Sequence, residues 1–213
     1  MPTQKRNYQR ELEQILKGLE ESRTVPRLLL HSCCAPCSSY VLEYLSQSFA
    51  ITVLYYNPNI SPREEYEHRK VEQLRLIAEG DWKNPVDFLD CDWDAGSFDA
   101  IAKGLENIPE GGVRCFACYQ LRLQAAAAAA KKGGYDYFTT TLSISPLKNA
   151  QKLNEIGEAL SQKYGVKHLP ADFKKKEGYK RSIELSRKYG LYRQDYCGCI
   201  YSREQREREK TNP

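Results

Sequence analysis

Seven of the eight cysteines in this chain lie in three short clusters, and thiols at such spacings can do metal or redox chemistry. The clusters contain Cys33, Cys34 and Cys37, then Cys115 and Cys118, and finally Cys197 and Cys199. Thiolates spaced zero to two residues apart can point into one small volume and are ligands for soft metal centres. The sequence therefore predicts a metal–thiolate or redox site that the fold assembles from distant segments.

Three kinds of site are consistent with these thiols. A structural zinc needs four thiolates, usually from two CxxC pairs in a small domain that folds around the metal. An iron–sulfur cluster also needs four cysteines, and seven clustered thiols, two of them adjacent, favour iron–sulfur over zinc. The Cys197–Cys199 pair would be strained if oxidised, so it also fits a labile dithiol. We expect Cys91 to be buried and inert in a strand, and His31 to be a core or rim residue rather than a ligand.

Alternating strands and helices must position these clusters. Short apolar runs predict strands at 27–32, 51–56, 86–93, 137–142 and 166–169. Periodic patterns predict helices at 7–22, 40–45 with Ser38 as N-cap, 63–78, 119–132, 148–164 and 178–189, with a looser segment before residue 112. This alternation predicts an α/β fold, a Rossmann-like parallel sheet with helices on both faces. Because ligands bind at the carboxyl ends of such strands, we expect the cysteine-rich metal site there.

Length and composition predict one sizeable domain. The chain has 213 residues, of which 41% are apolar and 28% charged, enough to bury a core without disulfides. We expect an N-terminal helical extension at 1–26, an α/β catalytic domain at 27–202, and a charged tail at 203–213 that is a frayed helix or disordered. We find no membrane span and no signal-peptide pattern, so we expect a cytoplasmic protein, where clustered cysteines more often mean metal or catalysis.

Nucleic acid is a more plausible partner than a nucleotide cofactor. The chain lacks both a GxGxxG and a GxxxxGK[ST] phosphate-binding motif. A net charge of +4, the basic run 174–181 and fifteen tyrosines permit binding to an unpaired base, although a solvated basic face explains the run as well. Arg114 and Arg122, which flank the second cysteine cluster, are further candidate cations. Asp172, beside the basic run, is the preferred acid–base candidate.

Six motifs resemble the epoxyqueuosine reductase family called QueH. In order between residues 27 and 202 they are LLLHSCCAPCS, YYNPNISPREEYEHR, RCFACYQLRL, FTTTLSISP, DFKKKEGY and LYRQDYCGCIYS. The resemblance implies an adenine-nucleotide-hydrolase-like fold and a cobalamin-independent iron–sulfur oxidoreductase. Its substrate would be tRNA with epoxyqueuosine at the wobble position of the anticodon loop, and reduction of the epoxide would complete queuosine synthesis. An electron donor, which the sequence does not identify, is also implied.

The resemblance also implies roles for the cysteines. Cys33, Cys34, Cys115 and Cys118 would ligate a [4Fe–4S] cluster. Cys197 and Cys199 would either form a redox-active disulfide pair or help to hold an additional mononuclear iron, for which Cys37 and a nearby carboxylate are further candidates. All seven thiols are thus candidate metal ligands, and Cys197, Cys199 and Asp172 are candidate catalytic groups.

Two other functions remain as alternatives. The first is an iron–sulfur-dependent tRNA thiolation-type enzyme on the same fold, which would normally activate the base with ATP. The missing phosphate-binding loop disfavours it. The second is a zinc-stabilised RNA-binding module without catalysis, which iron and sulfide analysis would distinguish from an iron–sulfur enzyme.

Overall fold

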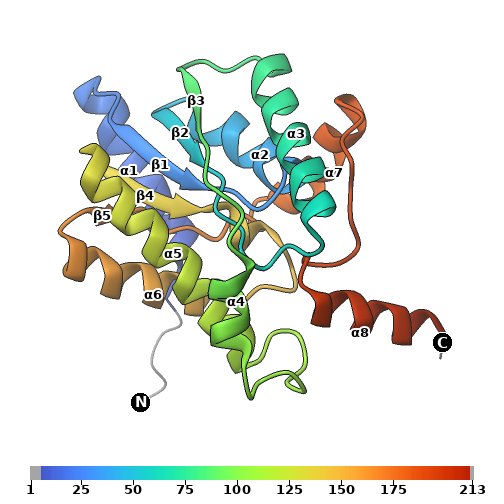
Figure 1. Cartoon of the computed structure of the whole chain (residues 1–213). Helices are drawn as coiled ribbons and strands as arrows, with labels where there is room; N and C mark the ends of the chain where they lie inside the picture. Colours follow the sequence, from blue (N-terminus) through green and yellow to red (C-terminus); the bar gives the residue numbers. More distant parts are fainter. Residues whose placement is uncertain (1–5, 212–213) are drawn as a thin grey trace.

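A five-stranded sheet, in which every strand is parallel to its neighbours, forms the centre of the molecule (Figure 1). The computed structural model describes residues 6–211. Across the sheet the strands are β3 (Val86–Leu89), β2 (Ala50–Leu54), β1 (Arg27–His31), β4 (Tyr137–Thr140) and β5 (Lys167–His168). The predicted α/β fold is confirmed. Chain progression across the sheet reverses between β1 and β4, the place where such folds bind ligands.

The side chains of β1 alternate between two hydrophobic cores. Leu28 and Leu30 point into one core and Leu29 into the other, as the two-residue period of a strand requires. The first core is covered by α1 (Tyr8–Ser22), α2 (Ala35–Leu45) and α3 (Arg63–Glu79), and α7 (Gly178–Lys188) packs on α2. The second core is covered by α5 (Val113–Gly133) and α6 (Ala150–Tyr164) (Figure 1). Both faces of the sheet are therefore buried, as is usual for parallel sheets.

Alanines let α5 pack closely on the sheet. Ala126, Ala127 and Ala130 are fully buried against the second core, where a larger side chain would hold the helix further away. The helix ends in a left-handed cap at Gly134, which has a φ of +64°. The Gly134 N–H donates to the carbonyls of Ala130 and Lys131 in the last turn. This anchors the helix that carries the second cysteine cluster.

Two predicted helix starts are wrong, and both corrections concern cysteines. Helix α2 begins at Ala35 with Cys34 as its N-cap, so Ser38 lies inside the first turn and is not the cap. Helix α5 begins at Val113, six residues before the predicted start, because Gly112 serves as N-cap without a side-chain signal. Because Cys199 directly precedes α8 (Ile200–Thr211), all three cysteine clusters lie at helix N-termini.

Other boundaries also differ from the prediction. The segment before residue 112 contains α4 (Ala95–Ala102), capped by Asp94, whose carboxylate accepts from the Ser97 N–H at 3.2 Å. Strand β3 ends at Leu89, so Cys91 lies in the following loop, partly buried. A 3-10 turn, η1 (Thr141–Ile144), replaces the end of the predicted fourth strand.

The terminal segments are helical where they are described. Helix α8 (Ile200–Thr211) includes most of the predicted tail, and residues 212–213 lie outside the described residues. Helix α1 packs on the first core through Leu12, which is fully buried. The division at residues 26 and 202 stays a prediction. None of the described helices has the length and apolar character of a membrane span.

Candidate functional site

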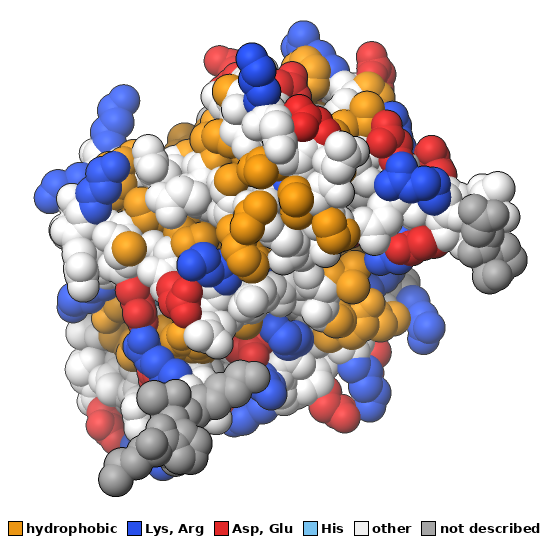
Figure 2. Space-filling view, turned by 90° about the horizontal axis from the view of Figure 1, so that it is seen from below, with side chains coloured by type: hydrophobic (Ala, Val, Ile, Leu, Met, Phe, Trp, Pro, Cys, Tyr) orange, Lys and Arg blue, Asp and Glu red, His pale blue; other side chains and the backbone are white. Residues whose placement is uncertain are grey.

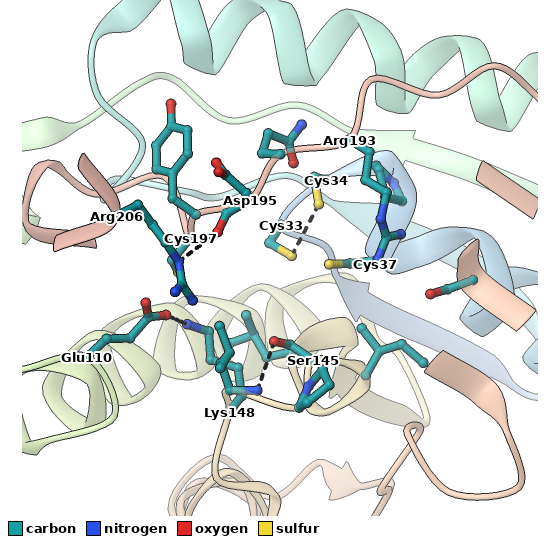
Figure 3. A pocket seen from close by; sticks show the side chains of 18 of the residues that line it. Cys33, Cys34, Cys37, Glu110, Ser145, Lys148, Arg193, Asp195, Cys197 and Arg206 are labelled. Atoms are coloured by element: carbon teal, nitrogen blue, oxygen red, sulfur yellow. Dashed lines mark hydrogen bonds and ion pairs between the residues drawn. The ribbon is translucent and has the colours of Figure 1, made fainter. Parts of the chain in front are cut away.

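The first cysteine cluster forms a thiol triad beside the junction of β1 and β4. Cys33 and Cys34 follow β1, and Cys37 lies in the first turn of α2. The three Sγ atoms lie within 4.8 Å of one another, and those of Cys33 and Cys34 are 3.8 Å apart (Figure 3). The Oγ1 atom of Thr141, directly after β4, lies 3.8 Å from the Cys33 Sγ. Three soft donors this close could share one metal centre.

Hydrogen bonds within the triad make its thiols unequal. Cys33 accepts hydrogen bonds from Cys34 and Cys37, which lower the pKa of Cys33 well below its ordinary value. The same contacts raise the pKa of Cys34 to about 12 and that of Cys37 well above its ordinary value. One thiolate therefore forms readily, and the other two protons leave only when a cation compensates the charge.

The triad opens into a cavity of about 670 Å³, within the size range of small-molecule sites. Its other lining side chains come from segments far apart in sequence (Figure 3), and they include Arg69, Glu110, Lys148, Tyr179, Arg193 and Cys197. We call this space the wide cavity. Its size and mixed lining suit a ligand with both ring and polar groups.

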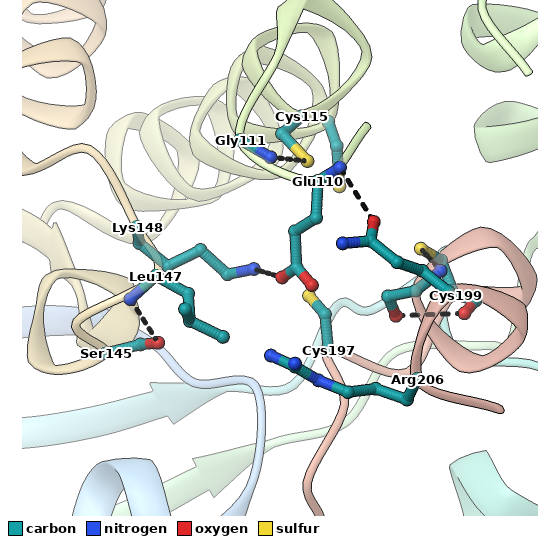
Figure 4. A network of polar contacts seen from close by, with 12 residues as sticks. Glu110, Gly111, Cys115, Ser145, Leu147, Lys148, Cys197, Cys199 and Arg206 are labelled. Atoms are coloured by element: carbon teal, nitrogen blue, oxygen red, sulfur yellow. Dashed lines mark hydrogen bonds and ion pairs between the residues drawn. The ribbon is translucent and has the colours of Figure 1, made fainter. Parts of the chain in front are cut away.

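The other two cysteine clusters meet around a narrow cavity of about 20 Å³. Its lining includes Cys115 and Cys118 from the start of α5, and Cys197 and Cys199 from the loop before α8. The Gly111 N–H donates to the Cys115 Sγ at 3.2 Å (Figure 4). Because Cys197 lines both cavities, they adjoin, and the structure brings all seven clustered thiols to one region.

Burial disfavours the charged form of three thiols in the narrow cavity. It raises the pKa of Cys118 to about 12 and also raises the pKa of Cys115 and of Cys199. Cys91 lines neither cavity, and burial raises the pKa of its thiol, in agreement with an inert residue. All eight cysteines carry free thiols, so a Cys197–Cys199 disulfide stays a prediction.

Gly198 allows the last cysteine pair to reach the cavities. Its φ of +112° is one that L side chains rarely adopt, and a Cβ there would lie 3.0 Å from Arg69 Nη1 and from Ile60 Cγ1. The Ser61 N–H donates to the Gly198 carbonyl at 3.0 Å, and Arg69 Nη1 donates to the Cys197 carbonyl at 3.3 Å. Segments after β2 and in α3 therefore fix the loop that carries these thiols.

A buried ion pair joins the two cavities. Lys148 Nζ lies 2.7 Å from Glu110 Oε1, and the two side chains are 5% and 9% exposed (Figure 4). Both residues line both cavities. Sequence reasoning missed the pair, and the only available signal was that Lys148 follows the predicted fourth strand by a few residues.

Arg122 and His31 form a buried network behind the thiols. Burial, followed by the nearby charge of Arg122, lowers the pKa of His31 to about 3, so the imidazole is neutral. Since a guanidinium can only donate, we assign His31 Nε2 as the acceptor from Arg122 Nε at 3.2 Å. His31 Nδ1 then donates to Thr140 Oγ1 at 2.8 Å. The prediction that His31 is a core residue is confirmed, since its side chain is fully buried.

The flanking arginines do not form a nucleic-acid surface. Arg114 and Arg122 are 2% and 1% exposed, so the interpretation that they contact nucleic acid directly is wrong. Arg114 instead donates to backbone carbonyls, including that of Glu106 at 2.8 Å. Both arginines organise the protein interior around α5.

Two polar side chains in the narrow cavity lack partners. Asn59 and Tyr119 are 1% and 2% exposed, and within residues 6–211 neither the Asn59 amide nor the Tyr119 hydroxyl has a hydrogen-bond partner. Buried polar groups are nearly always satisfied, so unpaired ones indicate an occupant that supplies partners. Sulfide and thiolate sulfurs can accept such hydrogen bonds, so the donor set fits an iron–sulfur group.

The predicted acid and part of the basic run line a third cavity, next to α6. Asp172 is 2.7 Å from Lys174 Nζ and lines neither thiol cavity, but its cavity shares Pro146, Lys148 and Tyr179 with the wide cavity and therefore adjoins it. A catalytic role for Asp172 stays a prediction. Lys176, Lys180 and Arg181 also pair with carboxylates. On the face shown in Figure 2, basic and acidic side chains are interspersed around hydrophobic ones, without one continuous basic patch.

Comparison with known proteins gives one consistent result. A family model described as "Epoxyqueuosine reductase QueH" matches residues 28–205. The chain is 44% identical over 203 residues to the protein of that name from Streptococcus pyogenes serotype M1, covering 94% of this chain and 80% of the relative. It is 44% identical over 206 residues to that of Staphylococcus epidermidis, covering 95% and 87%. It is 35% identical over 178 residues to that of Thermotoga maritima, covering 82% and 89%.

Proposed function

Since the chain belongs to the epoxyqueuosine reductase QueH family, we propose that its thiol-lined cavities are where it reduces epoxyqueuosine in the last step of queuosine biosynthesis. One observation supports this location for the reaction: seven thiols converge on two adjoining cavities at the carboxyl ends of β1 and β4. Family membership disfavours the two alternatives, a thiolation-type enzyme and a zinc-stabilised RNA-binding module.

The reaction requires two electrons and two protons. Both C–O bonds of the epoxide break, a carbon–carbon double bond forms between the two carbons, and the oxygen leaves as water. A [4Fe–4S] cluster, when bound, supplies electrons one at a time from an external low-potential donor. A second redox element beside the cluster would therefore be useful, and a proton source must lie beside the substrate.

Two divisions of the thiols are compatible with a four-cysteine cluster. The family resemblance gives Cys33, Cys34, Cys115 and Cys118 as ligands, with Cys37, Cys197 and Cys199 left for a disulfide or an additional mononuclear iron. The cavities group them differently, with Cys115, Cys118, Cys197 and Cys199 around one space and the triad around the other. Both divisions include Cys115 and Cys118.

The wide cavity is the proposed place for the modified nucleoside. Tyr179 at its edge is 37% exposed, and the guanidinium of Arg193 lies 5.5 Å from the ring centroid. An exposed ring paired with an arginine suits stacking by an unpaired base of an anticodon loop. Lys148, held by Glu110, keeps a proton at Nζ where the cavities adjoin, and we propose this pair as the proton source in place of Asp172.

One experiment tests the proposed function. Protein reconstituted with iron and sulfide under anaerobic conditions is mixed with a chemical reductant and tRNA carrying epoxyqueuosine, and the digested tRNA is analysed by mass spectrometry. We expect the modified nucleoside to lose one oxygen mass. Retention of that oxygen by iron- and sulfide-loaded protein would contradict the proposal.

Two variants distinguish the divisions of the thiols. If the cluster uses the triad, Cys33→Ala removes the [4Fe–4S] signal in electron paramagnetic resonance and Cys199→Ala retains it. If the cluster uses only the thiols of the narrow cavity, the two results are reversed. Cys91→Ala, outside both cavities, is the matched control and should retain the full signal.

A further inference from the structure

Arg122 carries a buried positive charge that has no carboxylate partner in the part of the chain that the structure describes. Its side chain is 1% exposed, and its three nitrogens contact His31 Nε2 at 3.2 Å, Asn57 Oδ1 at 2.5 Å and Cys118 Sγ at 4.0 Å. Among residues 6–211, no carboxylate oxygen lies within 4.0 Å of this guanidinium. Arg69, which is equally buried, has a carboxylate partner, since its Nη2 lies 2.6 Å from Glu65 Oε1.

A buried charge normally has an opposite charge beside it, because the loss of hydration is otherwise too costly. For Arg122 the neighbouring groups that can become anionic are thiols. Cys118 Sγ lies 4.0 Å from Arg122 Nη1, and Arg122 lines the narrow cavity together with Cys115, Cys118, Cys197 and Cys199. The arginine is therefore placed to act as a counter-charge for the thiols of the narrow cavity.

The two other partners of Arg122 are neutral and hold it in place. Asn57 Nδ2 donates to the Ser32 carbonyl at 2.8 Å, which turns its Oδ1 toward the guanidinium. His31 Nε2 accepts from Arg122 Nε, because a guanidinium can only donate, so this ring nitrogen carries no proton. Neutral acceptors orient the guanidinium without cancelling its charge, so that charge remains available to a thiolate-ligated centre.

We propose that Arg122 is a positioning residue that raises the reduction potential of the iron–sulfur centre, with Asn57 keeping its charge uncompensated. The proposal rests on the proposed function above. Four thiolates leave such a centre anionic, and each added electron makes it more negative. A fixed positive charge nearby stabilises the reduced form more than the oxidised form. Arg122 thus eases entry of the electrons that the reaction consumes.

The test is an anaerobic redox titration of the reconstituted protein, followed by electron paramagnetic resonance. We compare the parent with Arg122→Gln, Arg122→Lys and Asn57→Asp. Asn57→Asp is the sharpest change, because it keeps the arginine and places a carboxylate against it, although it loses the hydrogen bond to the Ser32 carbonyl. We expect the reduced-to-oxidised ratio at a fixed potential to fall about tenfold in Arg122→Gln and Asn57→Asp, a shift of about 59 mV for one electron. Arg122→Lys, which keeps the charge, should stay within threefold of the parent.

Each result decides the proposal. A ratio within twofold of the parent in iron-loaded Asn57→Asp overturns it. If Asn57→Asp does not load iron, the two Arg122 variants decide. Equal reduction potentials in Arg122→Lys and Arg122→Gln overturn the proposal, and so does loss of the cluster from both variants. A cluster that is present in Arg122→Lys alone supports the proposal. A parent protein that takes up no iron and sulfide contradicts the proposed cofactor instead, so the two failures are distinguishable.

Discussion

The two thiol-lined cavities adjoin but differ in size, in lining and in the way the fold builds them. The wide cavity has a volume of about 670 Å³, and one local segment, the turn from β1 into α2, supplies its triad. The narrow cavity has about 20 Å³, and its four thiols come from α5 and from a loop more than 60 residues later in the sequence. The proposed sites for the nucleoside and for the cofactor are therefore separate but in contact, which suits a reaction that passes electrons from one to the other.

The largest expected effect concerns the narrow cavity. Cys118→Ala removes a buried thiol that is a ligand in both divisions of the cysteines, so we expect loss of the cluster and a fall in activity on the order of 100-fold or more. Iron and sulfide analysis after reconstitution measures the first effect. Cys91→Ala is the control and should keep full iron. Full iron content in Cys118→Ala would show that the narrow cavity does not hold the cofactor.

The next effect concerns the ion pair between the cavities. Lys148→Met leaves the Glu110 carboxylate buried without its partner, which should destabilise the protein by about 3–5 kcal/mol. Urea denaturation of the metal-free protein measures this free energy. Lys152→Met is the matched control, since its pair with Glu155 is well exposed and should cost less than about 1 kcal/mol. Equal losses in the free energy of unfolding for the two variants would mean that the Lys148–Glu110 pair does not stabilise the fold.

A smaller effect concerns Gly198, which positions the last cysteine pair at the cavities. Gly198→Ala forces a side chain into a φ of +112° and against Arg69 and Ile60, at a cost of about 1–3 kcal/mol. Gly104→Ala is matched in its positive φ of +78° but meets no atom within 4 Å. We expect Gly198→Ala alone to change the alkylation rates of Cys197 and Cys199, measured by mass spectrometry. Unchanged rates would show that the close approach of Gly198 does not position these thiols.

The smallest effect lies away from both cavities. Burial, followed by the nearby charge of Arg6, lowers the pKa of His168 in β5 to about 3, from 6.5 in the unfolded chain. Below pH 6.5 the unfolded state therefore binds a proton that the folded state does not bind, so this stability is lost as pH falls from about 6.5 toward 3. Between pH 7.5 and 5.5 the loss should be about 1 kcal/mol. His168→Gln should remove this part of the pH dependence of urea denaturation, and an unchanged dependence would contradict it.

The sequence predicts the sheet well because apolar runs and turn residues are local signals. All five predicted strands exist, and the first cysteine cluster follows β1 as expected. The start of α5 was missed because Cys115, Phe116 and Cys118 are weak helix formers and Gly112 offers no capping side chain. Helix α4 was missed because it is short and contains Gly96.

The arrangement of the site could be predicted only in part. The position of the first cysteine cluster at the carboxyl ends of the strands follows from its place directly after β1, which local patterns indicate. Which thiols share a cavity depends on long-range contacts, such as the Ser61 N–H donating to Gly198, and local patterns do not encode these. The burial of Arg122 between β1 and α5 is also a tertiary fact, since an arginine beside a cysteine cluster is more often exposed.

The thiols that meet at the cavities come from nearly opposite ends of the chain, with Cys33 just after the first strand and Cys199 just before the last helix. In either proposed division, the cluster would act as a cross-link between segments about 80 residues apart and thereby restrict the unfolded chain. Iron supply would then govern the lifetime of the protein as well as its activity. Metal-free chains would open at the segment that carries Cys197 and Cys199 and expose it to proteases, whereas loaded chains would persist.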